Sequence, residues 1–125
     1  MLLLPVVSAG VEGLLTIRRS IQPKLGELAL PGGFMEMRET WQQACARELR
    51  EESEIEVDPA SISLFNVHTA LEGMLLVFGL APVFDAADLP PFRPTSEVSE
   101  RVILTRALEL AFPLHTLAMR QFFNG

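Results

Sequence analysis

Residues 31–57 read PGGFMEMRETWQQACARELREESEIEV, and this stretch decides the fold because a chain-breaking turn runs directly into the clearest helix of the sequence. The PGG turn at 31–33 interrupts any regular element. Thr40 has the side chain of a helix N-cap, so we expect the helix to begin just after it. An apolar stripe then repeats every four residues, and its members are Trp41, Cys45 and Leu49. This spacing is typical of a helix that packs one face on the core.

On both sides of this helix the apolar pattern predicts short strands, at Leu2–Ser8, Leu14–Arg18, Leu28–Leu30, Ser63–His68, Met74–Ala81 and Glu100–Thr105. Phe84–Ser96 is polar and rich in proline, which indicates a long loop. Arg106–Leu110 is expected to form a short turn or helix. Pro113 fits the first turn of a last helix that runs to Phe123. Strands interrupted by one helix and followed by another predict an α/β fold, a sandwich with a mixed sheet.

The composition fits one globular domain over residues 1–125, with 49% apolar residues and a net charge of −6. No run of basic residues is present, so we do not expect binding to the phosphate backbone of nucleic acids. The opening MLLLPVV lacks the basic start and the length of a secretory signal, and no segment reaches the length of a membrane span. The single cysteine, Cys45, excludes an internal disulfide and a four-cysteine zinc site, and a reducing, cytoplasmic setting is the expectation.

Half of the acidic residues, eight of sixteen, lie in residues 33–58. The tightest group is Glu48, Glu51 and Glu52, at positions i, i+3 and i+4 of one helix face, about 5–6 Å apart. Three like charges at this distance repel one another, so we expect a compensating divalent cation. Mg²⁺ and Mn²⁺ are the candidates, because both prefer oxygen ligands. The alternative is a solvated acidic face that pairs with neighbouring arginines.

The stretch 31–57 resembles the Nudix box. The family pattern is glycine, five residues, glutamate, seven residues, arginine-glutamate, an aliphatic residue, any residue, two glutamates, any residue, glycine and an aliphatic residue. The matching positions are Gly33, Glu39, Arg47, Glu48, Leu49, Glu51, Glu52 and Ile55. Glu54 departs from the pattern, because the family has glycine there, and Arg38 stands where many members have glycine. Left-handed backbone at Glu54 would cost on the order of 1 kcal/mol. The metal-binding positions of the family lie before Glu54, so we expect altered stability more than lost catalysis.

The resemblance implies an α/β/α sandwich in which a catalytic loop–helix–loop hydrolyses a nucleoside diphosphate linked to another group, with Mg²⁺ or Mn²⁺. It also implies a set of metal ligands, namely Glu48, Glu51, Glu52 and the carbonyl of Gly32. Glu51 and Glu52 would take part in the catalysis. Arg47 would orient the carboxylates, in part through Glu39. Elementary electrostatics points the same way, because an acidic protein repels a diphosphate unless bound cations reverse the local charge.

Candidates outside the box carry weaker signals. Glu97 and Glu100 follow the long loop, where many family members place a further acid as a metal ligand or general base. Glu97 is favoured because it lies nearer the loop end, and the alternative is a pair of surface glutamates. Substrate contacts are expected from strand ends and from the turn, at Arg18, Arg19, His68 and Gly33. The alternatives are plain surface arginines and a structural histidine.

The segments RRSIQPKLGELALPGGF (18–34) and LAFPLHTLAMRQFF (110–123) are similar to those of members that act on ADP-ribose, NADH or FAD. The expected partner is therefore a small nucleotide diphosphate derivative. One alternative is a Nudix-type domain that senses a nucleotide metabolite without hydrolysing it, and another is an interaction domain with its acidic face on the surface. The complete glutamate set argues against a sensor, because a sensor has no need of a repulsive cluster. A homodimer is compatible with the apolar content.

Overall fold

Short strands and two helices alternate along the chain, and the computed structural model describes all residues, 1–125. The strands are β1 (Leu2–Leu3), β2 (Pro5–Ser8), β3 (Val11–Arg19), β4 (Leu28–Ala29), β5 (Ser63–Thr69), β6 (Leu75–Leu80), β7 (Phe84–Asp85) and β8 (Val98–Leu104). The helices are α1 (Trp41–Ser53) and α2 (Pro113–Asn124), with single 3-10 turns at Pro59–Ser61 and Ala86–Asp88. Neither α1 nor α2 has the length and apolar character needed to cross a membrane.

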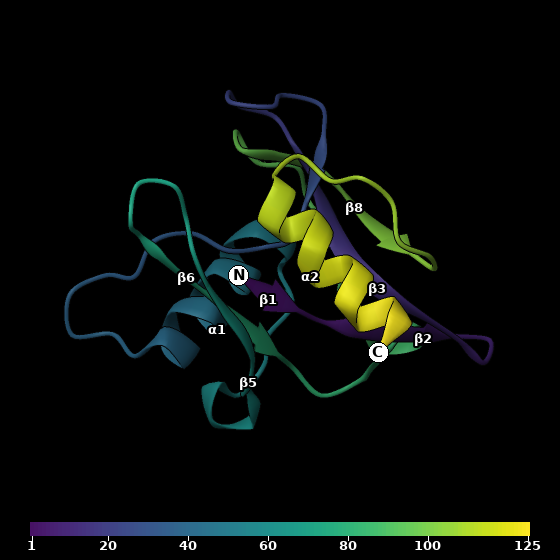
Figure 1. Cartoon of the computed structure of the whole chain (residues 1–125). Helices are drawn as coiled ribbons and strands as arrows, with labels where there is room; N and C mark the ends of the chain where they lie inside the picture. Colours follow the sequence, from purple (N-terminus) through teal and green to yellow (C-terminus); the bar gives the residue numbers. More distant parts are fainter.

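β3 is the centre of the larger, five-stranded sheet. It pairs antiparallel with β2, β4 and β8, and β7 joins parallel to β2. The smaller sheet has the order β1-β6-β5, and Figure 1 shows its β5–β6 hairpin reaching away from the larger sheet. Leu2–Ser8 was expected as one strand, but it divides at Leu4. The reason is that Leu2 and Leu3 pair with β6, whereas the residues after Leu4 pair with β3.

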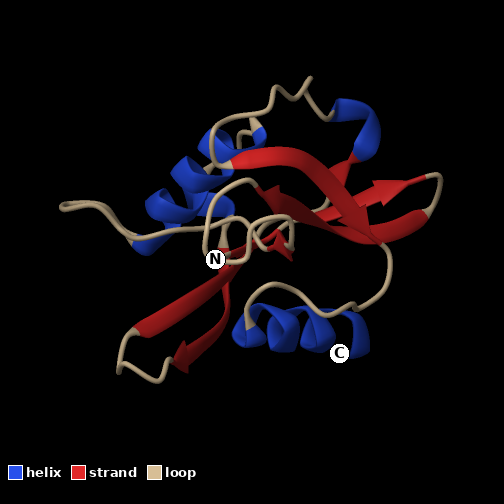
Figure 2. Cartoon of the chain, turned by 90° about the horizontal axis from the view of Figure 1, so that it is seen from above, coloured by secondary structure: helices blue, strands red, loops and turns tan.

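The helices cover opposite faces of the strands, as Figure 2 shows. Alternation along β1 produces two cores, because successive side chains of a strand point to opposite faces. Leu2 joins a cluster with Cys45 and Leu49 of α1, whereas Leu3 joins a cluster with Met119 of α2. The expected α/β/α sandwich with mixed sheets is confirmed.

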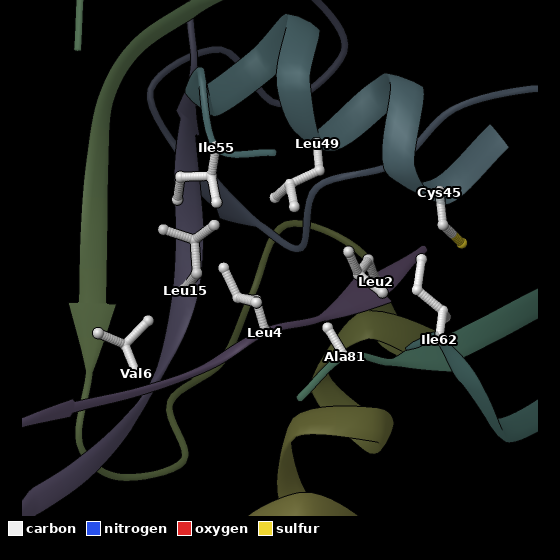
Figure 3. Close-up of a cluster of buried hydrophobic side chains, with 9 residues drawn as sticks. All are labelled: Leu2, Leu4, Val6, Leu15, Cys45, Leu49, Ile55, Ile62 and Ala81. Atoms are coloured by element: carbon white, nitrogen blue, oxygen red, sulfur yellow. The ribbon is translucent and has the colours of Figure 1, made fainter. Parts of the chain in front are cut away.

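Helix α1 begins where the sequence predicts. The Thr40 backbone N–H donates to Gln43 Oε1 (2.9 Å), and the Gln43 backbone N–H donates to Thr40 Oγ1 (3.1 Å). These reciprocal bonds form a capping box that satisfies N–H groups of the first turn. Figure 3 shows Cys45 and Leu49 pointing from the helix toward Leu2 and Leu4. The predicted stripe therefore packs on the core and fixes the rotation of the helix.

Replacement of Leu49 by alanine tests this packing. Leu49 is fully buried between α1 and the strands, so its truncation leaves a cavity and we expect the free energy of unfolding to fall by about 3 kcal/mol. Urea denaturation followed by circular dichroism measures the change. A loss below about 1 kcal/mol would mean that α1 is not held by this side chain.

Helix α2 carries a buried histidine that stays neutral. The Leu30 backbone N–H donates to His115 Nδ1 (3.1 Å), which requires an unprotonated nitrogen. Burial, with contributions from the charges of the N-terminal ammonium group and Arg19, lowers the pKa of His115 to about 3. The unfolded chain takes up this proton near pH 6.5, so the stabilising effect is complete above pH 6.5 and is lost as the pH falls toward 3.

A comparison with the variant His115→Gln isolates this effect, because the other titrating groups cancel between the two proteins. Glutamine can still accept the bond from the Leu30 N–H but does not titrate. We expect the stability advantage of the wild-type chain to shrink by about 2 kcal/mol between pH 6.5 and pH 5. An advantage that stays constant over this range in urea denaturation would show that His115 is not held neutral.

Three strand and loop predictions need correction. Phe84–Ser96 is not loop throughout, because Phe84 and Asp85 pair with Val6 and Val7 of β2 and a 3-10 turn follows. The last strand begins at Val98 rather than two residues later. Arg106–Leu110 forms a bend without a helix. The first two differences come from pairing with distant strands, which local patterns do not contain.

Candidate functional site

The glycine turn after β4 closes on the acidic face of α1. The Gly32 backbone N–H donates to Glu52 Oε1 (2.7 Å), and only 9% of Glu52 is exposed. Burial, together with the charges of Glu48 and Glu97, raises the pKa of Glu52 to about 8, although the bond from Gly32 opposes the shift. A carboxylate in this position needs a nearby positive charge to ionise at neutral pH.

Glu48 lies one turn before Glu52 and touches the same turn. A Cβ atom at Gly33 would lie 2.5 Å from Glu48 Oε1, so only glycine allows this approach. Burial raises the pKa of Glu48, and the hydrogen bond and charge of Arg47 oppose the shift. Gly32 and Gly33 thus place the backbone of the turn directly against the two carboxylates.

Arg47 ties the acidic cluster together. Its Nε donates to Glu39 Oε2 (2.7 Å), and its Nη1 donates to Glu48 Oε1 (2.9 Å) and Glu51 Oε2 (3.2 Å). Its Nη2 donates to the Phe34 carbonyl oxygen (3.0 Å) and again to Glu39 (3.1 Å). The hydrogen bond from Arg47 is the main reason why the pKa of Glu39 is lowered. One guanidinium therefore fixes three carboxylates and the loop before α1.

The carboxylates supply the donors that Mg²⁺ or Mn²⁺ prefers. Glu48 and Glu52 each use one oxygen in the bonds above, and the second oxygen of each accepts no hydrogen bond. Two half-engaged, repelling carboxylates beside a backbone turn fit a hard divalent cation. No three acidic, histidine or cysteine side chains converge as a ready-made cage. Glu51 is half exposed and bonded to Arg47, so it must turn to join a shared ligand set.

The two acids after the long loop have different surroundings. Glu97 is exposed, and its charge reaches the site, because it raises the pKa of both Glu48 and Glu52. Glu100 instead forms an ion pair with Arg18 on the surface. The charge of Glu97 therefore acts on the cluster, whereas Glu100 is engaged in a surface ion pair.

The residues expected to contact the substrate do not lie together in the structure. Arg19 donates to the Pro23 carbonyl oxygen (2.7 Å), lies over the Phe112 ring (5.2 Å) and acts electrostatically on Glu52. Arg18 is engaged by its ion pair and by the Gly26 carbonyl oxygen. Of the two arginines, Arg19 is therefore the one whose charge favours the ionised form of Glu52.

His68 lies on the β5–β6 hairpin with its ring edge-on to Phe78, 5.8 Å between centroids. The neighbouring Asn66 of the same strand face bonds to Gln121 of α2, so this face of the hairpin looks toward α2. The structure thus does not bring His68 together with the glutamates of α1.

Glu54 and Arg38, the two residues that stand where family members have glycine, both take left-handed backbone. Glu54 has φ 65° and ends α1, with its N–H donating to the Arg50 carbonyl oxygen, and Arg38 has φ 69°. The helix therefore ends at Glu54 in the left-handed conformation that glycine favours at this place. Each non-glycine residue accepts a strain on the order of 1 kcal/mol.

Sequence reasoning missed Arg101 and Arg93, which lie beside the C-terminal end of α1. Arg101 Nη1 donates to the Ser53 carbonyl oxygen (3.1 Å), and the Glu54 carboxylate accepts from the Arg93 backbone N–H (2.8 Å). One signal was available, because strand alternation puts Arg101 on the same face as the core residue Ile103. A charge at such a position needs partners.

An apolar pocket of about 300 Å³ adjoins the turn. Its lining includes Gly33, Trp41 and Cys45. Cys45 lies on α1 within one helical turn of Glu48. Apart from glycines its lining is hydrophobic, which suits the ring or chain of a ligand better than a charged group.

The sequence model of the NUDIX domain matches residues 4–118, which is most of the chain. The chain belongs to the NUDIX family. The match includes the turn, α1 and the acidic cluster, so the resemblance of residues 31–57 extends over this Nudix domain and not over the box alone.

Solved structures share the fold of this Nudix domain at low sequence identity. An Ap4A hydrolase from C. elegans superposes with a TM-score of 0.73 and 19% identity, over 97% of this chain and 92% of its own. A MutT NUDIX hydrolase from Burkholderia pseudomallei gives 0.69 and 21%, over 96% and 94%. The NUDIX domain of Shewanella oneidensis NrtR, complexed with ADP ribose, gives 0.67 and 22%, over 83% and 69%.

Proposed function

We propose that this Nudix domain is an enzyme that hydrolyses a nucleoside diphosphate linked to another group, with Mg²⁺ or Mn²⁺ as cofactor. The observation that carries the proposal is the approach of Gly32 and Gly33 to Glu52 and Glu48, which leaves one oxygen of each carboxylate outside any hydrogen bond. Buried, repelling carboxylates without a cation have no evident structural use, because they destabilise the helix that carries them.

Each residue has a role in this proposal. Glu48 and Glu52 hold the cation with the Gly32 carbonyl oxygen, and Glu51 assists after turning away from Arg47. Arg47 and Glu39 orient these carboxylates. Glu97 serves as a further ligand or accepts the proton of the attacking water. The bound cation would polarise the phosphoryl oxygens and neutralise the charge that develops in the transition state.

For the substrate we propose a dinucleotide-type diphosphate such as ADP-ribose, NADH or FAD. The ADP ribose bound by the Shewanella oneidensis domain and the activity of the C. elegans Ap4A hydrolase support this class. The apolar pocket beside Gly33 offers space for an uncharged ring, and Arg19 offers a positive charge for a phosphate. Residues 1–125 would act as one domain on this small molecule.

Product release from a substrate panel tests the function. The panel contains ADP-ribose, NADH, FAD, diadenosine polyphosphates and nucleoside triphosphates, each with Mg²⁺, with Mn²⁺ and with a chelator. We expect turnover of at least one diphosphate that the chelator abolishes. Turnover that persists in chelator would contradict the cation-dependent mechanism.

The same panel distinguishes the sensor alternative. If no compound is hydrolysed but one raises the melting temperature, the domain binds a nucleotide metabolite without cleaving it. Glu54 does not favour this alternative, because the backbone at that position keeps the left-handed conformation in which helices commonly end.

A further inference from the structure

We propose that Glu54 is a positioning residue that, together with Arg101, clamps residues 90–93 onto the C-terminal end of α1 and thereby restrains the segment that carries Glu97. This inference rests on the proposed function and goes beyond it, because the family pattern has a glycine without any side chain at this place.

The backbone conformation of Glu54 is unusual for a residue that carries a side chain. Its φ of 65° and ψ of 11° lie in the left-handed region, where glycine fits without strain. Glutamate is less suitable than glycine for this local conformation, so its presence points to a function of the side chain. That side chain reaches across to the long loop, where Glu54 Oε2 accepts the Arg93 backbone N–H at 2.8 Å.

The strength of this contact comes from the backbone bond. A carboxylate that accepts a backbone N–H makes a charge-assisted bond with one defined position of the loop. The Arg93 side chain adds an ion pair, 3.6 Å from Nη2 to Glu54 Oε1, but 88% of that side chain is exposed. Exposed pairs contribute little, so the clamp depends on the Glu54 carboxylate and not on the charge of Arg93.

Arg101 grips the same loop from β8. Its Nη2 donates to the Pro90 carbonyl oxygen (2.7 Å), and its guanidinium lies over the Phe92 ring, 5.5 Å from the centroid. Its Nη1 holds the Ser53 carbonyl oxygen at the end of α1 (3.1 Å). Arg101 therefore joins helix, strand and loop through one planar group, a geometry that lysine does not offer.

The clamp lies four residues before Glu97. On the other side, the Ser20 backbone N–H donates to the Glu97 carbonyl oxygen (2.8 Å), and the Glu97 N–H donates to Thr95 Oγ1 (3.2 Å). The short segment between Arg93 and Glu97 is thus fixed at both ends. Removal of the Glu54 carboxylate frees the Arg93 end, so that the Glu97 side chain, which makes no hydrogen bond or ion pair of its own, is less well oriented.

The variant Glu54→Gly tests the clamp, because it removes the carboxylate and relieves the backbone strain at once. We expect amide hydrogen exchange at the non-proline residues of the segment 92–97 to accelerate about tenfold and kcat to fall about tenfold, with KM nearly unchanged. Glu54→Gln keeps an oxygen that can accept the Arg93 N–H, so we expect it to restore kcat to within about threefold of the wild-type value. The matched control is Arg38→Gly, which relieves similar strain at an exposed side chain that makes no hydrogen bond, and we expect no change in exchange or kcat.

The outcomes separate this inference from the proposed function. Unchanged exchange at the non-proline residues of 92–97 in Glu54→Gly overturns the clamp, and faster exchange with unchanged kcat overturns the positioning of Glu97. A purely structural cap predicts equal or higher melting temperature and full activity for Glu54→Gly. If the wild-type chain hydrolyses no substrate, the proposed function fails, whereas exchange and Mn²⁺ affinity in Glu54→Gly still decide the clamp. Weakened affinity with faster exchange supports it, and unchanged values overturn it.

Discussion

Glu52→Gln is expected to keep the fold and to lower turnover at least about a hundredfold, a loss in the range seen when a key electrostatic group is removed from an active site. Glutamine has nearly the same shape and can still accept the Gly32 N–H, but it carries no negative charge. Hydrolysis of the best substrate from the panel, measured at saturating Mg²⁺, gives the change in kcat.

The matched control for this variant is Glu12→Gln, which removes one exposed glutamate on β3. It lowers the net negative charge by the same amount at a place without contact to the cluster. We expect its kcat to equal that of the wild-type chain. Near wild-type turnover in Glu52→Gln would remove Glu52 from the mechanism and with it the proposed metal site.

Arg47→Met is expected to have the second largest effect, on stability and activity together. The Arg47 side chain is 15% exposed and holds Glu39, Glu48 and Glu51. Its loss leaves these carboxylates to repel one another, so we expect the free energy of unfolding to fall by about 2 kcal/mol. The cation would also lose its oriented ligands, and kcat/KM should fall about 10- to 100-fold.

Arg50→Met is the control for Arg47→Met, because Arg50 lies on the same helix but is exposed and forms no ion pair. A change of only a few tenths of a kcal/mol is expected there, since surface charges contribute little. Urea denaturation and steady-state kinetics on both variants measure the difference. Equal effects in the two variants would mean that the Arg47 network does not organise the site.

The helix and its acidic face were predictable because they depend on short-range rules. Thr40 and Gln43 lie in one turn, and the spacing of Leu49 and the three glutamates follows from the helical period. The sequence pattern also predicted most strands. It did not predict the division at Leu4, because the whole segment 2–7 is apolar and the change of sheet depends on which distant strand each part meets.

The part of the site that escaped prediction depends on long-range contacts. The bond between Arg93 and Glu54 joins residues 39 positions apart, and that between Arg101 and Ser53 joins residues 48 apart. Residue type alone did not distinguish Glu97 from Glu100, because both follow the same loop. The difference arises from Arg18, which engages Glu100 in an ion pair, whereas Glu97 makes no ion pair and its charge acts on Glu52.

Binding of Mn²⁺, followed by electron paramagnetic resonance in the absence of substrate, shows whether Glu48 and Glu52 form a divalent-cation site. We expect that the wild-type chain binds Mn²⁺, that Mg²⁺ competes, and that Glu52→Gln raises the dissociation constant at least about tenfold while Glu12→Gln leaves it unchanged. Equal affinity of the wild-type chain and Glu52→Gln, or no binding by the wild-type chain, would contradict this site.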